Sequence, residues 1–232
     1  MYVSLNKLRK ISFAPVELSL LSPTNLSNSQ LIAYVPGATD DFEQDYDAEA
    51  FGTFSDLFYS VLPNKKLVIQ GKVEAFTPED KVTLGANFFQ NGLYTIALEN
   101  KEGIFNGSQN IYLKDKQEGI ITNLSQGSYT FVATKADNAT RFEIIYKPEA
   151  VLATGGSAKD QIIVYRDGTD FVIKSPKGIA NVEVYDNSGK LMVILKPNDT
   201  TAILDVSAIP NGGYILKIKT KDGGIVSRKI VR

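Results

Sequence analysis

Apolar residues recur at every second position in short segments along most of the chain. Val, Ile, Leu, Phe and Tyr alternate with polar residues in four clear examples: Lys66–Gly71, Gly92–Leu98, Ser128–Ala133 and Arg141–Tyr146. Period-two alternation in short segments bounded by Gly, Asn and Asp is typical of half-buried β-strands. No segment has the periodicity of an amphipathic helix, although Thr77 followed by Pro78 predicts one helical turn. The pattern therefore predicts an all-β protein of antiparallel β-sandwiches.

Turn residues separate these segments. Asn91-Gly92, Asn106-Gly107, Gln126-Gly127 and Asp222-Gly223 each place a glycine between two predicted strands. Glycine adopts positive φ without steric cost, so we expect positive φ at all four glycines.

A stretch of small residues divides the chain. Residues 150–160 read Ala-Val-Leu-Ala-Thr-Gly-Gly-Ser-Ala-Lys-Asp, which is typical of a linker, with the boundary near Gly155. We therefore predict a jelly-roll-like β-sandwich over residues 1–149 that serves as an accessory or stalk module. Residues 161–232 predict a small Ig-like sandwich of seven strands, namely Gln161–Tyr165, Asp170–Lys174, Ala180–Tyr185, Lys190–Leu195, Ala202–Asp205, Gly213–Thr220 and Gly224–Val231. In the sixth of these strands, Ile215 and Ile218 are expected to fill the core.

Composition removes several function classes. The 232 residues contain no Cys and no His, so Cys nucleophiles, thiolate or His-ligated metals and Ser-His-Asp triads are excluded. The net charge is −1 and the Lys and Arg residues do not cluster in sequence, which argues against a nucleic-acid partner. Residues 160–232 hold 11 basic and 8 acidic residues, whereas the preceding 159 hold 14 and 18. We predict that the chain is not an enzyme.

The last third of the chain carries an ordered set of motifs. A hairpin reads Val182-Glu-Val-Tyr-Asp-Asn-Ser-Gly-Lys190, a corner reads Leu204-Asp-Val-Ser-Ala-Ile-Pro-Asn-Gly-Gly-Tyr214, and Lys221-Asp-Gly223 precedes a final Lys229-Ile-Val-Arg232. This succession resembles the C-terminal sorting domains of Bacteroidetes type IX secretion substrates. The residues that carry the resemblance are Tyr185, Gly189, Lys190, Asp205, Pro210, Gly212, Tyr214, Asp222, Gly223 and Lys229.

The resemblance implies a destination and partners. Such domains are recognised by the type IX translocon and outer-membrane shuttle components, which implies a secreted or cell-surface protein associated with the outer membrane. A generic bacterial Ig-like domain is the alternative. The Asn-Pro found near the first strand of the commonest subclass is replaced here by Tyr165-Arg-Asp-Gly168. Because the first residues lack an export signal, we expect the chain to be the C-terminal part of a longer protein.

Residues 1–148 also resemble a segment that precedes sorting domains in large Flavobacterium-type secreted proteins. The carrying stretches include Tyr34–Asp40, Asp45–Asp47, Ile111–Asp115 and Ser128–Phe131. That segment accompanies many different cargos, so the resemblance implies little about activity.

An acidic loop, residues 40–49, is the richest chemical feature. Its sequence is Asp-Asp-Phe-Glu-Gln-Asp-Tyr-Asp-Ala-Glu. Carboxylates are the oxygen ligands that Ca²⁺ prefers, so Asp40, Asp41, Asp45 and Asp47 are candidate calcium ligands. A solvated surface loop is the alternative. No other cofactor is indicated.

Aromatic residues could form a sugar-binding platform or a sandwich core, and we favour the core. They are Phe51, Phe54, Phe58, Tyr59, Phe88, Phe89, Phe105 and Tyr112. We therefore expect a non-catalytic C-terminal region of an exported protein. The alternative is a calcium-assisted carbohydrate-binding or adhesin module with surface polysaccharide as partner.

Overall fold

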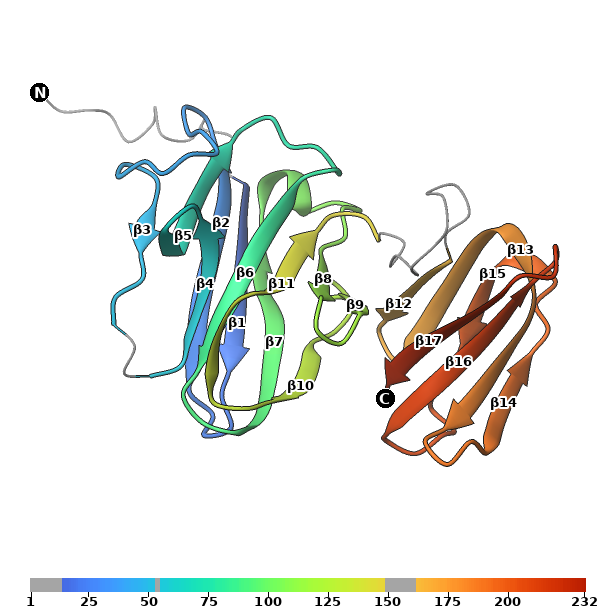
Figure 1. The fold of residues 1–232 in the computed structure, drawn as a ribbon. Coiled ribbons are helices and arrows are strands. Elements are labelled where there is room, and N and C mark those ends of the chain that lie inside the picture. The colour runs from blue at the N-terminus through green and yellow to red at the C-terminus, as the bar shows by residue number, and fades with distance from the viewer. Residues whose placement is uncertain (1–13, 53–54, 149–161) are drawn as a thin grey trace, which may run out of the picture. The chain divides into compact units, whose positions relative to one another are not determined.

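Strands form nearly all of the regular structure in residues 14–52, 55–148 and 162–232, which are the residues that this computed structural model describes (Figure 1). The chain divides into two units. The first unit comprises residues 1–113 and 128–146, and the second comprises residues 114–127 and 147–232. The predicted linker, residues 150–160, and Phe54 lie outside the described residues.

The first unit is a β-sandwich. Its elements are β1 (Ala14–Leu21), β2 (Ser27–Val35), β3 (Ala48–Glu49), β4 (Leu57–Leu62), β5 (Lys65–Val73), β6 (Lys81–Phe88), β7 (Gly92–Lys101), η2 (Gly103–Phe105), β10 (Tyr129–Ala133) and β11 (Ala136–Ile145). Strands β10, β7, β1, β2 and β5 pair in that order, while β4, β6 and β11 form the facing layer. The β4–β5 hairpin connects the two layers. Strand β8 (Tyr112–Asp115) leads from this unit into the second.

Alternate side chains of both layers fill the core of the first unit. Val16, Leu18 and Leu20 of β1 are buried, as are Leu84 and Phe88 of β6. Side chains two residues apart on a strand share a face, so this burial pattern follows directly from the period-two sequence. The core is rich in aromatic rings, and Phe88, Tyr94 and Phe131 lie within ring-contact distance of one another.

The second unit is a smaller Ig-like sandwich. Its elements are β9 (Ile120–Asn123), β12 (Ile163–Asp167), β13 (Asp170–Asp186), β14 (Leu191–Leu195), β15 (Asp199–Leu204), β16 (Gly213–Thr220) and β17 (Ile225–Val231). The first part of β13 pairs with β12 and β15, and its last part pairs with β14 and β16. Strand β17 completes the second layer beside β16. The core between the layers contains Phe171, Val184, Leu204, Tyr214 and Ile230, among others.

The all-β fold class is confirmed, with two differences in detail. First, β2 and β5 run parallel, so the sheets are mixed rather than purely antiparallel. Second, the predicted strands Asp170–Lys174 and Ala180–Tyr185 belong to one continuous element, β13. The strand bends at the register shift between Lys174 and Ile179, where Gly178 has φ +72° and lets one strand serve both layers.

Residues 114–127 belong to the second unit although they precede β10 and β11 of the first. Thr122 of β9 pairs in parallel with Arg166 of β12. The side-chain amide of Asn123, which is buried, donates to Asp167 Oδ1 at 2.9 Å. These pairings are between residues far apart in the sequence, so periodicity did not predict them.

Two expectations about turns also differ from the structure. Gly92 and Gly223 have positive φ, at 152° and 91°, but Gly107 and Gly127 do not. Residues 77–80 form a turn without a helix, in which the Asp80 amide donates to the Thr77 carbonyl at 3.0 Å. In the described residues of the first unit, a short 3-10 helix occurs at η2.

In β16 the core residues are Tyr214, Leu216 and Ile218, whereas Ile215 is 40% exposed. The expectation that Ile215 fills the core with Ile218 is therefore wrong. Positions an odd number of residues apart point to opposite faces of a strand. Ile215 consequently lies on the outer face of its sheet.

Candidate functional site

The acidic loop crosses from β2 to β3 in the first unit. The Tyr46 side chain packs closely against Gly37 and Gly71 and so holds the loop in place. A Cβ added at Gly71 would lie 2.6 Å from Tyr46 Cβ, and a Cβ added at Gly37 would lie 2.7 Å from the Tyr46 hydroxyl. Only glycine at both positions leaves room for this ring. The loop is thus held against the end of β2 and the middle of β5.

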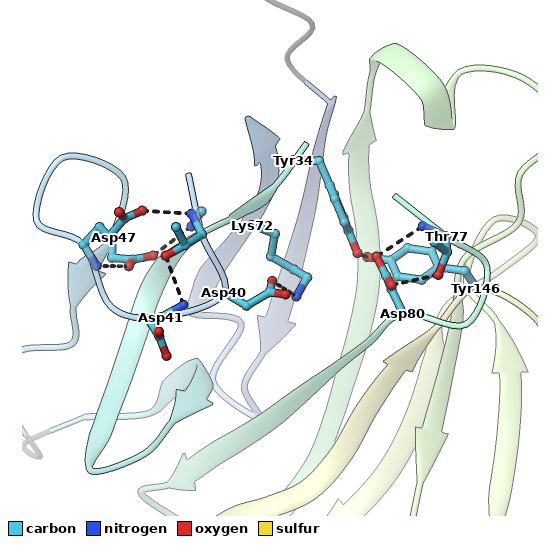
Figure 2. A network of polar contacts seen from close by, with 11 residues as sticks. Tyr34, Asp40, Asp41, Asp47, Lys72, Thr77, Asp80 and Tyr146 are labelled. Carbon is cyan, nitrogen blue, oxygen red and sulfur yellow. Dashed lines mark hydrogen bonds and ion pairs between the residues drawn. The ribbon is translucent and has the colours of Figure 1, made fainter. Parts of the chain in front are cut away.

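Asp47 accepts two backbone hydrogen bonds, and Figure 2 shows it at the base of the loop. Its Oδ2 accepts from the Glu43 amide at 2.7 Å, and its Oδ1 accepts from the Gly71 amide of β5 at 2.8 Å. Glu43 in turn accepts from the Thr39 amide at 2.9 Å. These carboxylates close the loop on itself, since each satisfies amides that a turn leaves unpaired.

Asp40 forms an ion pair across the loop. Its Oδ1 lies 2.6 Å from Nζ of Lys72, whose side chain is 10% exposed (Figure 2). The Asp41 backbone amide donates to Thr39 Oγ1 at 3.3 Å. Asp41 and Asp45 are both exposed to solvent. In the described part of the chain, no three acidic residues are grouped so that they could hold a metal ion. The structure therefore does not bring Asp40, Asp41, Asp45 and Asp47 together as a calcium site.

We expect Asp47→Ala to lower the free energy of unfolding of the first unit by about 2 kcal/mol, because two amides lose a charged acceptor. The matched control is Asp45→Ala, which removes an exposed carboxylate of the same loop and should change stability by less than about 0.5 kcal/mol. Urea denaturation of both variants measures the difference. Equal losses in the two variants would contradict the structural role of Asp47.

Four aromatic rings pack together beside this loop. Tyr34, Phe76, Phe105 and Tyr146 have centroid separations from 4.9 to 6.1 Å. The Tyr34 hydroxyl donates to the Tyr146 hydroxyl at 3.2 Å, and burial raises the pKa of both phenols above their usual range (Figure 2). Tyr34 and Tyr146 are thus buried and hydrogen-bonded to each other in the interior of the first unit.

Most of the predicted platform aromatics are core residues. Phe58, Tyr59, Phe88, Phe105 and Tyr112 are buried. Phe51 is 97% exposed and Phe89 is 45% exposed, so the core interpretation is wrong for these two. Phe89 lies under Lys135, whose Nζ is 4.6 Å from the ring centroid.

Two tyrosine–carboxylate pairs lie within the first unit. The Tyr94 hydroxyl donates to Oδ1 of the buried Asp56 at 2.6 Å, and Asp56 also accepts from the Phe89 amide. Tyr59 and Lys66 both donate to Asp137. Burial raises the pKa of Tyr59 and Tyr94 above the ordinary phenol range. Neither phenol is therefore suited to act as a base at neutral pH.

The residues that carry the sorting-domain resemblance form turns and a corner in the second unit. In the β13–β14 turn, Asp186 Oδ1 accepts from the amides of Ser188 and Lys190, at 2.8 and 2.9 Å, and Gly189 has φ +82°. The hydrogen bonds from Ser188 and the Lys190 amide lower the pKa of Asp186. Tyr185 precedes the turn and donates to Glu183 Oε2 at 2.7 Å.

Pro210 and Tyr214 make the corner before β16. The buried Tyr214 hydroxyl donates to the Pro210 carbonyl at 2.7 Å, which is a tyrosine corner of the kind seen in Ig-like sandwiches. Asp205 begins this segment by accepting from the Ser207 amide, and hydrogen bonds from Ser207 lower its pKa. The Gly212 carbonyl accepts from the Arg232 amide at 3.0 Å, so the corner also holds the end of β17.

The third turn joins β16 to β17. Asp222 Oδ1 accepts from Thr220 Oγ1 at 2.5 Å, and its Oδ2 lies 3.0 Å from Lys177 Nζ. Gly223 has φ +91°. Lys229 of β17 donates to Glu118 Oε2 at 2.8 Å. The motif residues are thus distributed over three turns and the three strands β13, β16 and β17, and they do not converge on one pocket.

Hydrogen bonds from Thr220 and Lys177 lower the pKa of Asp222 to about 2. A carboxyl whose folded pKa lies below its unfolded value stabilises the fold above the unfolded pKa. This contribution is lost as the pH falls from about 4 to about 2. We therefore expect Asp222→Asn to lower the thermal midpoint of the second unit at pH 6 but to have little effect near pH 2.

The check is a set of calorimetric melts of both proteins between pH 6 and pH 2. A stability difference that does not shrink on acidification would contradict the role of the Asp222 carboxylate. Asp170→Asn, at the half-buried first residue of β13, serves as the control for a general loss of negative charge.

A small cleft lies within the second unit. It is lined by Gly119, Ile120, Ile121, Val164, Phe171, Arg228, Lys229 and Ile230. Most of these side chains are apolar and belong to the core or to residues 114–127. The cleft is therefore the seam along which residues 114–127 pack on β12 and β17. In the described residues there is also no helix long and apolar enough to cross a bilayer.

Two family models match the sequence. One is described as Domain of unknown function (DUF8693) and matches residues 12–146, and the other is described as Domain of unknown function (DUF8694) and matches residues 153–232. The search of curated proteins found no match.

Among solved structures, the chain is similar to a DUF3244 family protein with an immunoglobulin-like β-sandwich fold from Bacteroides vulgatus ATCC 8482. The identity is 17% and the TM-score is 0.28, and the match covers 31% of this chain and 82% of that one.

Proposed function

We propose that this chain, which belongs to the family described as Domain of unknown function (DUF8693), is the non-catalytic C-terminal region of an exported protein. In this proposal the second unit is the address that the type IX secretion machinery recognises. Its partners are the translocon and the outer-membrane shuttle components. Its destination is the cell surface or the medium.

One observation carries the proposal. The hairpin, corner, Lys-Asp-Gly turn and basic last strand of type IX sorting domains occur here in the same order and spacing. In this chain their residues also have defined structural roles. Gly189 and Gly223 adopt positive φ in turns, and Tyr214 closes the corner on Pro210. The motif residues therefore have defined places in one folded unit.

The character of the first unit is compatible with a stalk or accessory role. Its acidic loop is used in ion pairs and backbone capping, and its tyrosine–carboxylate pairs hold phenols with raised pKa values. Such groups stabilise loops and layers of a sandwich rather than transfer protons. We therefore assign recognition to the second unit.

Export of a reporter tests the proposal. The whole chain, residues 1–232, is fused behind a periplasmic export signal and a fluorescent reporter in a host that has the type IX pathway. We use the whole chain because residues 114–127 are part of the second unit. The expected result is reporter on the surface or in the medium, and reporter held in the periplasm of a matched strain without the translocon.

Periplasmic retention in both strains would overturn the proposal. A fusion that carries Tyr214→Phe provides a graded control. This variant keeps the ring in the core but removes the hydrogen bond to Pro210, so it should remain folded. Normal export of the variant would show that export requires only the fold, and reduced export would show that it also requires the corner hydrogen bond.

A further inference from the structure

The outer face of one layer of the second unit combines lysines with exposed apolar side chains. On β16, Ile215, Lys217 and Lys219 alternate with the core residues and so point outward. The strand register places them beside outward residues of β13 and β17. We call this surface the lysine face and define it by Tyr185, Leu191, Ile215, Lys217, Lys219 and Lys229.

The register orders the lysine face into rows. Tyr185, Ile215 and Lys229 lie opposite one another on three adjacent strands, with Leu191 next to Tyr185 on β14. Leu191 is 42% exposed and Ile215 is 40% exposed. They lie on either side of Tyr185, so the three side chains form an apolar and aromatic row, and a partner that covers this row removes apolar surface from water.

The charge of this face is positive. It carries Lys217, Lys219 and Lys229, and Glu183 is the acidic residue among them. Glu183 lies 3.8 Å from Lys217 Nζ, and the Lys217 side chain is 48% exposed. An ion pair with this separation and exposure contributes little, so an incoming carboxylate can compete for Lys217.

The structure also shows how a carboxylate binds at one end of the lysine face. Glu118, from residues 114–127, accepts from Lys229 Nζ at 2.8 Å, and the Lys229 side chain remains 52% exposed. Lys217 and Lys219 are two residues apart on one strand, a separation of roughly 6.8 Å. Carboxylates two residues apart on an extended chain have the same spacing.

We propose that the lysine face is a docking site for an acidic protein segment, with carboxylates that bind Lys217 and Lys219 and an apolar side chain that covers Ile215 and Leu191. The inference deepens the proposed function, because it names the surface by which the second unit would meet its export partner. The apolar row distinguishes a protein partner from a simple polyanion, which would contact the lysines alone.

Binding of a defined peptide to the full chain tests the proposal. The probe is Glu-Ser-Glu-Ser-Leu-Ser-Leu, blocked at both ends, and the counter-probe has Lys in place of both Glu residues. Calorimetry at low salt should detect binding of the probe only, and roughly 0.3 M salt should weaken it because exposed charges are screened. Lys217→Glu/Lys219→Glu should weaken binding at least about tenfold.

The matched control is Lys174→Glu/Lys196→Glu, which makes the same charge change outside the lysine face. It should bind the probe within about twofold of the wild type. Ile215→Ser should weaken probe binding but leave binding of polygalacturonate, an acidic polysaccharide, unchanged. Equal effects of the two double variants, or equally tight binding of polygalacturonate and probe, would overturn the proposal. Absence of probe binding at low salt would also overturn the proposal.

The export assay separates this inference from the function on which it rests. If the wild-type fusion is not exported but the peptide results hold, the export function fails and the docking site stands. If the Lys217→Glu/Lys219→Glu fusion is exported as well as the wild type, the lysine face is not the export contact. Thermal melts of all variants confirm that each protein is folded, since every changed side chain is exposed or half-exposed.

Discussion

Tyr214→Ala is expected to lower the free energy of unfolding of the second unit by about 3 to 5 kcal/mol, the range for removing a buried aromatic side chain. The ring is 4% exposed within the core, and its hydroxyl binds the Pro210 carbonyl. The same change should abolish export in the fusion assay. A unit of this size has only a few kcal/mol of net stability to lose.

Two controls separate the contributions of Tyr214. Tyr214→Phe keeps the packing and removes one hydrogen bond, so about 1 to 2 kcal/mol is expected. Ile215→Ala, at the next position of β16, removes a side chain that is 40% exposed and should cost less than about 1 kcal/mol. Chemical denaturation followed by tyrosine fluorescence measures all three. A loss for Ile215→Ala as large as that for Tyr214→Ala would refute the assignment of faces on β16.

Phe105→Ala is expected to have a comparable effect on the first unit, again about 3 to 5 kcal/mol. Phe105 is fully buried, and its ring contacts the rings of Tyr34, Phe76 and Tyr146. The cluster joins η2, β2 and the segment after β5. Loss of the ring should therefore also expose the Tyr34–Tyr146 hydroxyl pair to water.

Amide hydrogen exchange locates this effect. We expect faster exchange around Tyr34 and residues 74–80 in Phe105→Ala, while the second unit keeps the protection of the wild type. Ile104→Ala is the matched control, because Ile104 is adjacent in η2 but 45% exposed. If Ile104→Ala speeds exchange as much as Phe105→Ala, the aromatic cluster does not stabilise this end of the unit.

The acidic loop shows why residue type alone did not define a site. Its carboxylates are the right ligands for Ca²⁺, but ligation requires several of them to converge on one point. Here Asp40 points to Lys72, whereas Asp47 points to the amides of Glu43 and Gly71. These partners come from β5, 24 and 32 residues further along the chain, or from the loop's own backbone. Sequence spacing contains no information about that pairing.

The sequence by itself determined the all-β class, most strand positions, and the turns in which Gly92 and Gly223 adopt positive φ. These features depend on side-chain alternation and local backbone sterics, which act between neighbouring residues. The corner of Pro210 and Tyr214 is local for the same reason, because its hydrogen bond spans four residues.

Only the tertiary structure decided which face of β16 is covered and which distant segments meet. It placed Ile215 outside and Leu216 inside, made β2 and β5 parallel neighbours, and assigned residues 114–127 to the second unit. Each depends on contacts between residues far apart in the chain. The lysine face is of this kind too, since β13, β16 and β17 contribute to it only after they pair.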